Sequence, residues 1–316
     1  MKAIQITEFG GPEVMTYVEL PDPTPSASQT LITVEAVGIN YADTHQIQNS
    51  YLSPQKLPMV PGLEVVGRTP SGQRVLAPTD GGYAQLVAAD TNSLIPIPDG
   101  VSDGAALAMM VQGSTAFHIL KTMGHLKTGE SVVIHAAAGG VGTIAIQLAK
   151  MWGAFVIAVT STGAGKADLA RSLGADVVVD AESPDLLAAL LAANSGRPVD
   201  LVLEMVGGAT FEASLAALAP FGRLVTYGMA SRVPPRPITS GELMHGSKTV
   251  TGFWLANCFG RPELLQGVIA ELFDLIVAGK LKPIVGSTYA LSQARQAHEA
   301  MLARKSTGKI VLDPKN

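Results

Sequence analysis

Hydrophobic and polar positions follow two different rhythms along this chain. From Met1 to about Asp99, short β-rich runs such as residues 31–36 and 74–77 are separated by clusters of proline and glycine. Short runs of this kind, bounded by residues that favour turns, are typical of a compact, irregular β domain. The pattern therefore predicts a first domain of that type over residues 1–112.

The rhythm changes after Gly113. Residues 131–136 form a short apolar run, and the helical spacing of residues 140–152 places Ile144 and Leu148 on one face. This unit repeats: further strands are expected at residues 155–160, 177–180, 201–204, 224–227 and 249–253, and helices at residues 164–173, 186–194 and 210–218. Alternating strands and helices predict a doubly wound parallel sheet, here a Rossmann domain over residues 113–257.

The last part of the chain is expected to rejoin the first domain. Residues 262–278 have the spacing of a long amphipathic helix, and residues 281–316 are too short to fold alone. We therefore expect an α/β protein in which residues 1–112 and 258–316 form the β domain and enclose the Rossmann domain.

Composition narrows the class of protein. Hydrophobic residues make up 47% of the 316 positions, enough to fill two cores, and charged residues only 15%. The formal net charge is −4 and no basic run occurs, so nucleic acid is not an expected partner. The predicted partner is a small molecule.

Several features favour the cytoplasm. The single cysteine, Cys258, cannot form an internal disulfide or a site of several thiolates. The start of the chain has neither the basic residues nor the apolar run of a secretory signal. Glycines and Lys150 interrupt the most apolar region, residues 132–159, so a membrane span is not expected.

A glycine-rich turn is the strongest chemical signal. The segment HAAAGGVG at residues 135–142 follows a predicted strand and opens a predicted helix. Gly139 and Gly142 occupy the second and third glycine positions of the dinucleotide fingerprint, and Ala137 the first. Gly140 and Val141 can then present N–H groups to a pyrophosphate at the helix N-terminus. The alternative is a tight turn that needs small residues.

The end of the next strand indicates which cofactor is bound. Enzymes of this fold that use NAD place an acidic residue there, against the ribose 2′-hydroxyl. Residues 159–166 read VTSTGAGK and contain no acid. The hydroxyls of Thr160 and Ser161 and the charge of Lys166 suit a 2′-phosphate, which predicts NADPH. Alternatively, Lys166 is a solvated lysine in the first turn of a helix.

Five segments together resemble one family: Gly38-Ile-Asn-Tyr-Ala-Asp43, Pro61-Gly-Leu-Glu-Val-Val-Gly67, Gln112-Gly-Ser-Thr-Ala116, the glycine turn, and Thr307-Gly-Lys-Ile-Val311. Through them the chain resembles, over essentially its whole length, the zinc-free, zeta-crystallin-like NADPH:quinone oxidoreductase branch of the medium-chain dehydrogenase/reductase superfamily. The resemblance implies a GroES-like β domain with a Rossmann domain, and hydride transfer from NADPH to a quinone or similar conjugated carbonyl. It also implies a homodimer, joined through the strand at residues 249–253.

The zinc ligands of related dehydrogenases are missing. Zinc-dependent members of the superfamily have a cysteine and a histidine where this chain has Asn40 and Leu63. Glu64 alone is a poor zinc site, and a four-cysteine lobe is impossible with one cysteine. No metal is therefore expected, and alcohol dehydrogenase chemistry is disfavoured.

Two residues are candidates for catalysis. Asn40 replaces a metal ligand of the relatives, so we expect its amide to face the substrate and orient it; alternatively, it caps local backbone. Tyr51 matches a tyrosine of quinone and enoyl-thioester reductases that is thought to donate a proton or hold the substrate. A phenol is a feasible donor, and the alternative is a pocket wall with its hydroxyl in water.

Asn40 is also expected to bind the cofactor, and the resemblance implies further cofactor-binding residues: Thr115, Val206, Gly228, Phe253, Leu255 and Lys309. For Asp43 and Glu64 we expect structural roles, fixing loops or pairing with arginine or lysine.

Two other functions remain open. Residues 46–51 and 252–255 are similar to segments of 2-enoyl thioester reductases, which would make enoyl-CoA or an acyl carrier thioester the substrate. The chain could also be a non-catalytic NADPH-binding protein, as lens crystallins of this family illustrate.

Overall fold

The computed structural model describes residues 1–50, 52–161, 163 and 165–315. The chain forms two compact units. One consists of Met1–Gln112 with Cys258–Asn316, and the other of Gly113–Asn257. We call them the outer unit and the inserted unit, after their order along the chain.

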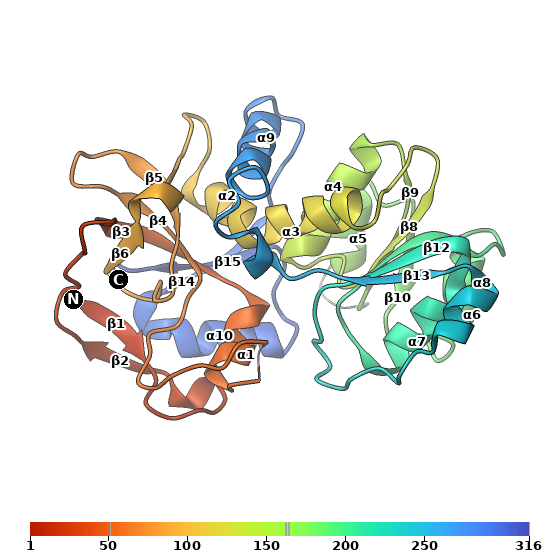
Figure 1. Ribbon diagram of the computed structural model, residues 1–316, viewed down its shortest axis with the longest axis horizontal. Coiled ribbons are helices and arrows are strands. Elements are labelled where there is room, and N and C mark those ends of the chain that lie inside the picture. The colour runs from red at the N-terminus through yellow and green to blue at the C-terminus, as the bar shows by residue number, and fades with distance from the viewer. Residues whose placement is uncertain (51, 162, 164, 316) are drawn as a thin grey trace. The chain divides into compact units, whose positions relative to one another are not determined.

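The inserted unit contains a six-stranded sheet with the order β10-β9-β8-β11-β12-β13 (Figure 1). All neighbouring strands in it are parallel. The strands are β8 (Ser131–Ile134), β9 (Phe155–Thr160), β10 (Val177–Asp180), β11 (Val199–Glu204), β12 (Leu218–Thr226) and β13 (Thr249–Gly252). The chain order runs outward from β8 in one direction and from β11 in the other. In sheets of this type, ligands bind outside the carboxyl ends of the strands at that reversal.

Five helices of the described part of this unit pack against the sheet and bury its strands: α4 (Gly140–Met151), α5 (Lys166–Ser172), α6 (Leu186–Ala193), α7 (Gly208–Ala217) and α8 (Ser240–Gly246). A further helix, α3 (Ser114–Phe117), packs against α4. One core cluster joins strand residues such as Val133 and Val202 to Phe211 and Leu215 of α7. Strands of parallel sheets that are buried on both faces are nearly continuously hydrophobic, as seen here.

The predicted elements of this unit are found with small shifts. β9 and β10 have the predicted bounds, and α4 ends one residue before the predicted end. β12 is longer than predicted, because it begins at Leu218 instead of residue 224. The extra residues pair Leu218 with Val199 of β11 across a register irregularity, which an apolar pattern does not reveal.

The outer unit is built on a seven-stranded sheet with the order β14-β15-β3-β4-β5-β7, in which β6 also pairs with β3. Its strands are β3 (Gln29–Ile39), β4 (Glu64–Arg68), β5 (Arg74–Pro78), β6 (Leu86–Asp90), β7 (Ile95–Pro96), β14 (Val285–Ala290) and β15 (Lys309–Asp313). β1 (Lys2–Gln5) and β2 (Thr16–Glu19) form a separate antiparallel pair. A buried core that includes Ile4, Val37, Val65 and Leu312 joins these strands.

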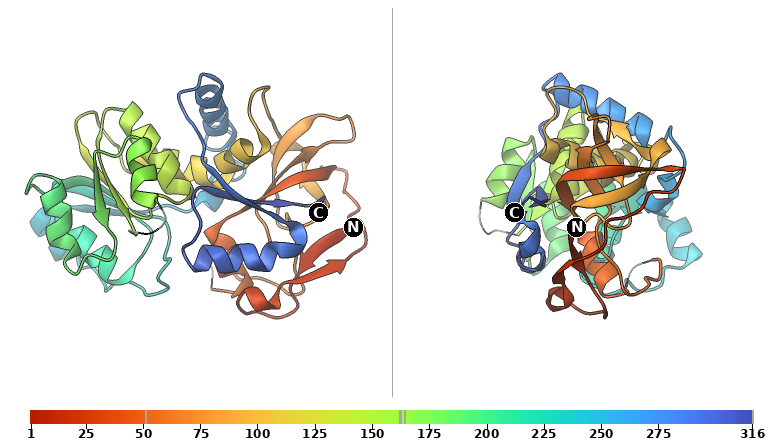
Figure 2. Two further views of the ribbon diagram at one scale, coloured as in Figure 1. Left: turned by 180° about the vertical axis from the view of Figure 1, so that it is seen from behind. Right: turned by 90° about the vertical axis from the view of Figure 1, so that its left-hand side faces the viewer.

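The C-terminal segment joins this sheet. β15 pairs antiparallel with β3, with Leu312 opposite Val37. The ends of the chain lie on the same unit (Figure 2), where Gln85 accepts a hydrogen bond from the N–H of Lys2 at 2.8 Å and donates one to the carbonyl of Pro314 at 3.1 Å. The tail is therefore part of the unit that the first residues begin.

The outer unit also contains helices that the sequence pattern did not predict. α1 (Tyr41–Ile47) begins after Asn40, whose N–H donates to Asp43 Oδ2 at 2.8 Å. α2 (Asp103–Ala108) begins after Ser102, whose hydroxyl accepts from the N–H of Ala105 at 3.3 Å. Most residues of both helices are buried, so they lack the alternating polar face by which a helix is recognised in a sequence.

Two helices of the outer unit follow the inserted unit in the chain. They are α9 (Gln266–Val277), inside the predicted range of residues 262–278, and α10 (Ala294–Leu302). No helix among the described residues combines the length and the apolarity that crossing a membrane requires.

Candidate functional site

The glycine turn lies at the carboxyl end of β8, beside the reversal of strand order. α4 begins directly after Gly139, and no side chain among the described residues caps its N-terminus. Gly142 allows the helix to approach the turn closely, because a Cβ there would lie 2.5 Å from the carbonyl oxygen of Ala136. The first turn of α4 thus presents backbone N–H groups with no side-chain acceptor, an arrangement that fits a pyrophosphate.

Polar groups gather at the end of β9, the next strand of the sheet. Lys166, the first residue of α5, is 8% exposed, and its Nζ lies 3.4 Å from the hydroxyl of Ser161. Thr160, also buried, donates to the carbonyl of Ser161 at 3.4 Å. The three predicted residues therefore lie together, with an ammonium and two hydroxyls at a strand end that carries no acid.

The loop after β11 is held by a buried carboxylate. Oε1 of Glu204 accepts hydrogen bonds from the N–H groups of Val206 at 2.7 Å and Gly207 at 2.9 Å. Burial raises the pKa of Glu204, while these two N–H groups lower it. Sequence analysis did not identify Glu204, although an acidic residue that ends an apolar strand is a signal that could have done so. Glu204 fixes the backbone of the predicted residue Val206.

Phe253 stacks on a histidine that sequence analysis did not identify. The rings of His118 and Phe253 stack with centroids 5.4 Å apart and an interplanar angle of 29°. His118 begins a π-helical segment, His118–Thr122, which directly follows the helix that contains Thr115. π-Helical segments are rare and frequently lie at functional sites.

Of the remaining predicted residues of the inserted unit, Gly228 and Leu255 follow the ends of strands, and Thr115 lies in α3. Gly228 follows β12, where a Cβ would come within 3.2 Å of Met205. Leu255 is buried, and Thr115 is buried as well. The site candidates Thr115, Val206, Gly228, Phe253 and Leu255 therefore belong to one unit, together with the glycine turn.

Asn40, in the outer unit, belongs to a buried polar cluster with Glu64 and Lys309. The Nδ2 of Asn40 donates to Glu64 Oε1 at 2.8 Å, and its Oδ1 accepts from Lys309 Nζ at 3.0 Å. Lys309 and Glu64 form an ion pair, and neither side chain has exposed surface. Asn40 is 3% exposed. The structural role expected for Glu64, pairing with a lysine, is confirmed.

The structure gives Lys309 different partners from the cofactor that the resemblance implied. Its three N–H groups are directed to Glu64, to Asn40 Oδ1 and to the carbonyl of Ile39 at 3.1 Å. Burying a carboxylate is costly unless a cation pairs with it, and the Lys309 ammonium is that cation. Contact of Lys309 with a cofactor stays a prediction that this arrangement does not favour.

Asp43 belongs to a second buried network in the outer unit. Its Oδ2 accepts from the Tyr83 hydroxyl at 2.8 Å, and that hydroxyl lies 2.9 Å from Nε2 of His298. Burial raises the pKa of Asp43 to about 7 and lowers that of His298 to about 4. Burial also raises the pKa of Tyr83 well above its usual value, so its hydroxyl keeps its proton. Tyr83 therefore donates to Asp43, and neutral His298 donates from Nε2 to Tyr83.

The catalytic candidate Tyr51 and the question of a metal site remain. Tyr51 lies outside the described residues. Within the described part of the chain, no group of three or more histidine, cysteine, aspartate or glutamate side chains is arranged to hold a metal ion. The ammonium of Lys309 lies directly against the Glu64 carboxylate.

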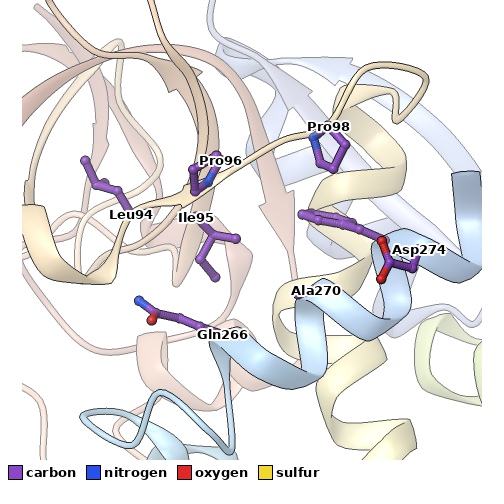
Figure 3. A pocket seen from close by; sticks show the side chains of 8 residues that line it. Leu94, Ile95, Pro96, Pro98, Gln266, Ala270 and Asp274 are labelled. Carbon is purple, nitrogen blue, oxygen red and sulfur yellow. The ribbon is translucent and has the colours of Figure 1, made fainter.

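In the described part of the chain, two hollows lie away from the predicted site residues. Figure 3 shows one of about 290 Å³ in the outer unit, between residues 94–98 and the side of α9 that carries Gln266, Ala270 and Asp274. The other, of about 560 Å³, lies near the start of β8 and β13 in the inserted unit and is lined by residues that include Glu130, Arg223 and Thr249. The second hollow is thus at the opposite end of the strands from the glycine turn.

Comparison with known proteins identifies the family. Residues 140–275 match the family model described as zinc-binding dehydrogenase, and residues 26–99 match the alcohol dehydrogenase GroES-like domain. A quinone oxidoreductase of Pseudomonas aeruginosa is 34% identical over 326 residues, which cover 99% of this chain and 99% of that protein.

Solved structures of similar fold support the same family. A mycobacterial protein in complex with NADPH superposes with a TM-score of 0.93 at 36% identity, covering 99% of this chain and 100% of the other. The quinone oxidoreductase of Escherichia coli, also in complex with NADPH, gives a TM-score of 0.92 at 30% identity, with 99% and 100% covered.

Fold and matches together define a protein with a GroES-like β domain and a Rossmann-type parallel-sheet domain. The chain belongs to the medium-chain dehydrogenase/reductase superfamily, in its quinone oxidoreductase branch. The fold class and the family inferred from the sequence are confirmed.

Proposed function

We propose that this protein is an NADPH-dependent oxidoreductase that reduces a quinone or a similar conjugated carbonyl without zinc. One observation carries the proposal: among the described residues no side chain caps the glycine-turn helix, and it lies next to a strand end with a lysine and no acid, in a chain whose full-length relatives include quinone oxidoreductases. The proposed acceptor is a small molecule of the class that the names of the relatives give, a quinone.

The described residues fit the cofactor. The N–H groups of Gly140 and Val141, after Gly139, would hold the pyrophosphate, and Thr160, Ser161 and Lys166 would hold the 2′-phosphate. The residues proposed for the nicotinamide end are Asn40, Thr115, Val206, Gly228, Phe253 and Leu255. NADPH supplies the hydride for the reduction.

Positioning is the main task of the chain in such a reaction. A conjugated carbonyl is already electrophilic, so its reduction needs alignment and stabilisation of the charge that develops on its oxygen. Asn40 is our candidate for orienting that oxygen, and Tyr51 for donating a proton or closing the pocket wall. Glu204 and His118 would act indirectly, by holding Val206 and Phe253 in place.

The absence of zinc is part of the proposal. At the two positions where zinc-dependent relatives supply a cysteine and a histidine, this chain has Asn40 and Leu63. Glu64, the carboxylate next to them, already has the Lys309 ammonium as its counter-charge, and a metal cation there would face that positive charge. Metal analysis of the purified protein, with activity assayed before and after treatment with a chelator, tests this part.

We also propose a cytoplasmic homodimer. The single cysteine cannot form an internal disulfide, which suits a reducing compartment. β13 is an edge strand of the described sheet, and an edge can pair with its copy in a second chain. Sedimentation as a monomer at micromolar concentration would contradict the dimer.

The function is tested by following NADPH oxidation with 1,4-benzoquinone, 9,10-phenanthrenequinone and crotonyl-CoA, with NADH in parallel. We expect turnover of a quinone and a preference for NADPH. Turnover of crotonyl-CoA alone, lost in Tyr51→Phe, would instead identify a 2-enoyl thioester reductase. No turnover with any acceptor, but binding of NADPH, would identify a non-catalytic binding protein.

A further inference from the structure

The cluster around Lys309 determines how the Asn40 amide is oriented. An ammonium can only donate, so the atom of Asn40 that faces Lys309 Nζ at 3.0 Å must be Oδ1. A carboxylate can only accept, so the atom that lies 2.8 Å from Glu64 Oε1 must be Nδ2. Turning the amide over would place its NH₂ group against the ammonium and its oxygen against the carboxylate.

Further contacts hold the same residue. Nε2 of Gln112 lies 3.5 Å from Asn40 Oδ1, and the backbone N–H of Asn40 donates to Asp43 at 2.8 Å. Glu64 and Lys309, the two partners of the amide, are the first residues of β4 and β15. Both strands pair with β3, so the sheet fixes the backbone of both residues. The side chain therefore has one rotamer and one amide orientation.

One N–H of the amide is available for another molecule. Nδ2 carries two hydrogens, and within the described part of the chain it donates only to Glu64. Asn40 keeps 3% of its surface exposed, whereas Lys309 and Glu64 keep none. Of these three residues, only Asn40 can therefore reach a bound molecule.

We propose that Lys309 is a positioning residue that orients and polarises the Asn40 amide, so that its second Nδ2–H binds the oxygen of the conjugated carbonyl acceptor. This inference rests on the proposed function. The ammonium at Oδ1 draws electron density from the amide nitrogen, and hydrogen bonds linked in this way strengthen one another. NADPH would supply the hydride, and the proton would come from water directly or through a side-chain hydroxyl. Asn40 would bind the oxygen on which the negative charge develops.

The test is a double-mutant cycle that removes the charge without leaving a single charge buried. Lys309→Met with Glu64→Gln replaces the ion pair by neutral side chains of similar size, and Asn40→Ala removes the amide. We expect the paired variant to lower kcat for the quinone roughly tenfold to a hundredfold, somewhat less than deletion of an oxyanion donor does. The Kd for NADPH should stay within about twofold, because the Lys309 side chain has no exposed surface with which to contact the cofactor.

The decisive measurement is the same paired change made in the Asn40→Ala background. If Lys309 acts through Asn40, it should change kcat by less than about twofold there. The matched control is Arg74→Met with Asp103→Asn, which removes another ion pair of the outer unit and should leave kcat unchanged in both backgrounds.

A second readout does not need turnover. The side-chain amide protons of Asn40, assigned with the Asn40→Ala variant, should shift upfield in the NMR spectrum when the ion pair is neutralised, because a weaker dipole deshields them less. Equal losses of kcat in both backgrounds, or an unchanged amide shift, would overturn the inference and leave the proposed function standing. Failure of the wild type to reduce any quinone would overturn the proposed function and this inference with it.

Discussion

The hydroxyl of Tyr83 lies 2.9 Å from Nε2 of His298, although 215 residues separate the two in the chain. Tyr83 precedes β6, and His298 lies in α10, so this buried contact ties the C-terminal segment to the first part of the outer unit. Both side chains are fully buried, and the same hydroxyl donates to Asp43. One phenol thus satisfies polar groups on two other elements.

Replacing Tyr83 by phenylalanine should therefore destabilise the protein. The change keeps the ring but leaves Asp43 and His298 each short of a hydrogen-bond partner, which costs about 1–3 kcal/mol for a buried group. Urea unfolding followed by circular dichroism measures the loss. Tyr17→Phe is the control, because Tyr17 is 41% exposed and its change should cost less than about 0.5 kcal/mol. Equal stability of the two variants would contradict the network.

Asp43 should make stability depend on pH. Burial raises its pKa from 3.8 to about 7, so between these values the folded protein binds more protons than the unfolded chain. The contribution of Asp43 to the free energy of unfolding is therefore fully present below about pH 4 and is lost as the pH rises towards 7. Asp43→Asn lacks this titration, so its stability relative to the wild type should increase over that window, by up to the order of 4 kcal/mol.

The measurement is the free energy of unfolding of both proteins at several pH values between 4 and 8. Asp99→Asn, at an exposed position, is the control and should give a curve parallel to the wild type. Parallel curves for Asp43→Asn would show that Asp43 titrates alike in the folded and unfolded states.

The two buried polar networks of the outer unit, one around Asp43 and Tyr83 and the other around Glu64 and Lys309, mark the limit of what the sequence could predict. The parallel strands were found because each is a short apolar run between turns, a signal contained within one segment. α2 was missed because four of its six residues are buried, which leaves no polar face to count. The ion pair of Glu64 and Lys309 joins residues 245 positions apart, and no local pattern indicates which distant lysine balances a buried carboxylate.

The candidate site shows the same division. The glycine turn and the three polar residues at the end of β9 were predicted, because each lies within a few positions of a recognisable strand end. Asn40 was selected from the resemblance, but its hydrogen bonds to Glu64 and Lys309 were not predicted. His118 was missed because its role depends on the ring of Phe253, which only the fold brings near it. Glu204 was missed although its partners lie two and three positions further along the chain, because the turn that directs their N–H groups to its carboxylate is not visible in the sequence.

Gly142 should not tolerate a side chain. A Cβ at this position would lie 2.5 Å from the Ala136 carbonyl oxygen and 2.6 Å from Cα of Ala137, and backbone atoms cannot yield as a flexible side chain would. Gly142→Ala should therefore push α4 away from the turn, raise the Kd for NADPH by about tenfold or more, and cost about 1–3 kcal/mol of stability.

Fluorescence titration with NADPH and urea unfolding measure the two effects. The control is Gly241→Ala in α8, where the nearest atom to the added Cβ is Thr239 Oγ1 at 3.9 Å. That variant should bind NADPH as the wild type does. Unchanged NADPH binding by Gly142→Ala would mean that the turn does not hold the pyrophosphate.

Lys166 should discriminate between the two nicotinamide cofactors. Its ammonium lies 3.4 Å from the Ser161 hydroxyl, at a strand end where no acid would repel a phosphate. A hydrogen bond to a charged group contributes about 1.5–3 kcal/mol, so Lys166→Ala should raise the Kd for NADPH about tenfold to a hundredfold. NADH lacks the 2′-phosphate, and its Kd should change by less than about twofold. Titration of both cofactors, with exposed Lys127→Ala as the control, measures the difference. Equal weakening of NADPH and NADH would instead mean that Lys166 supports the fold of the site, because only a contact with the 2′-phosphate can separate the two cofactors.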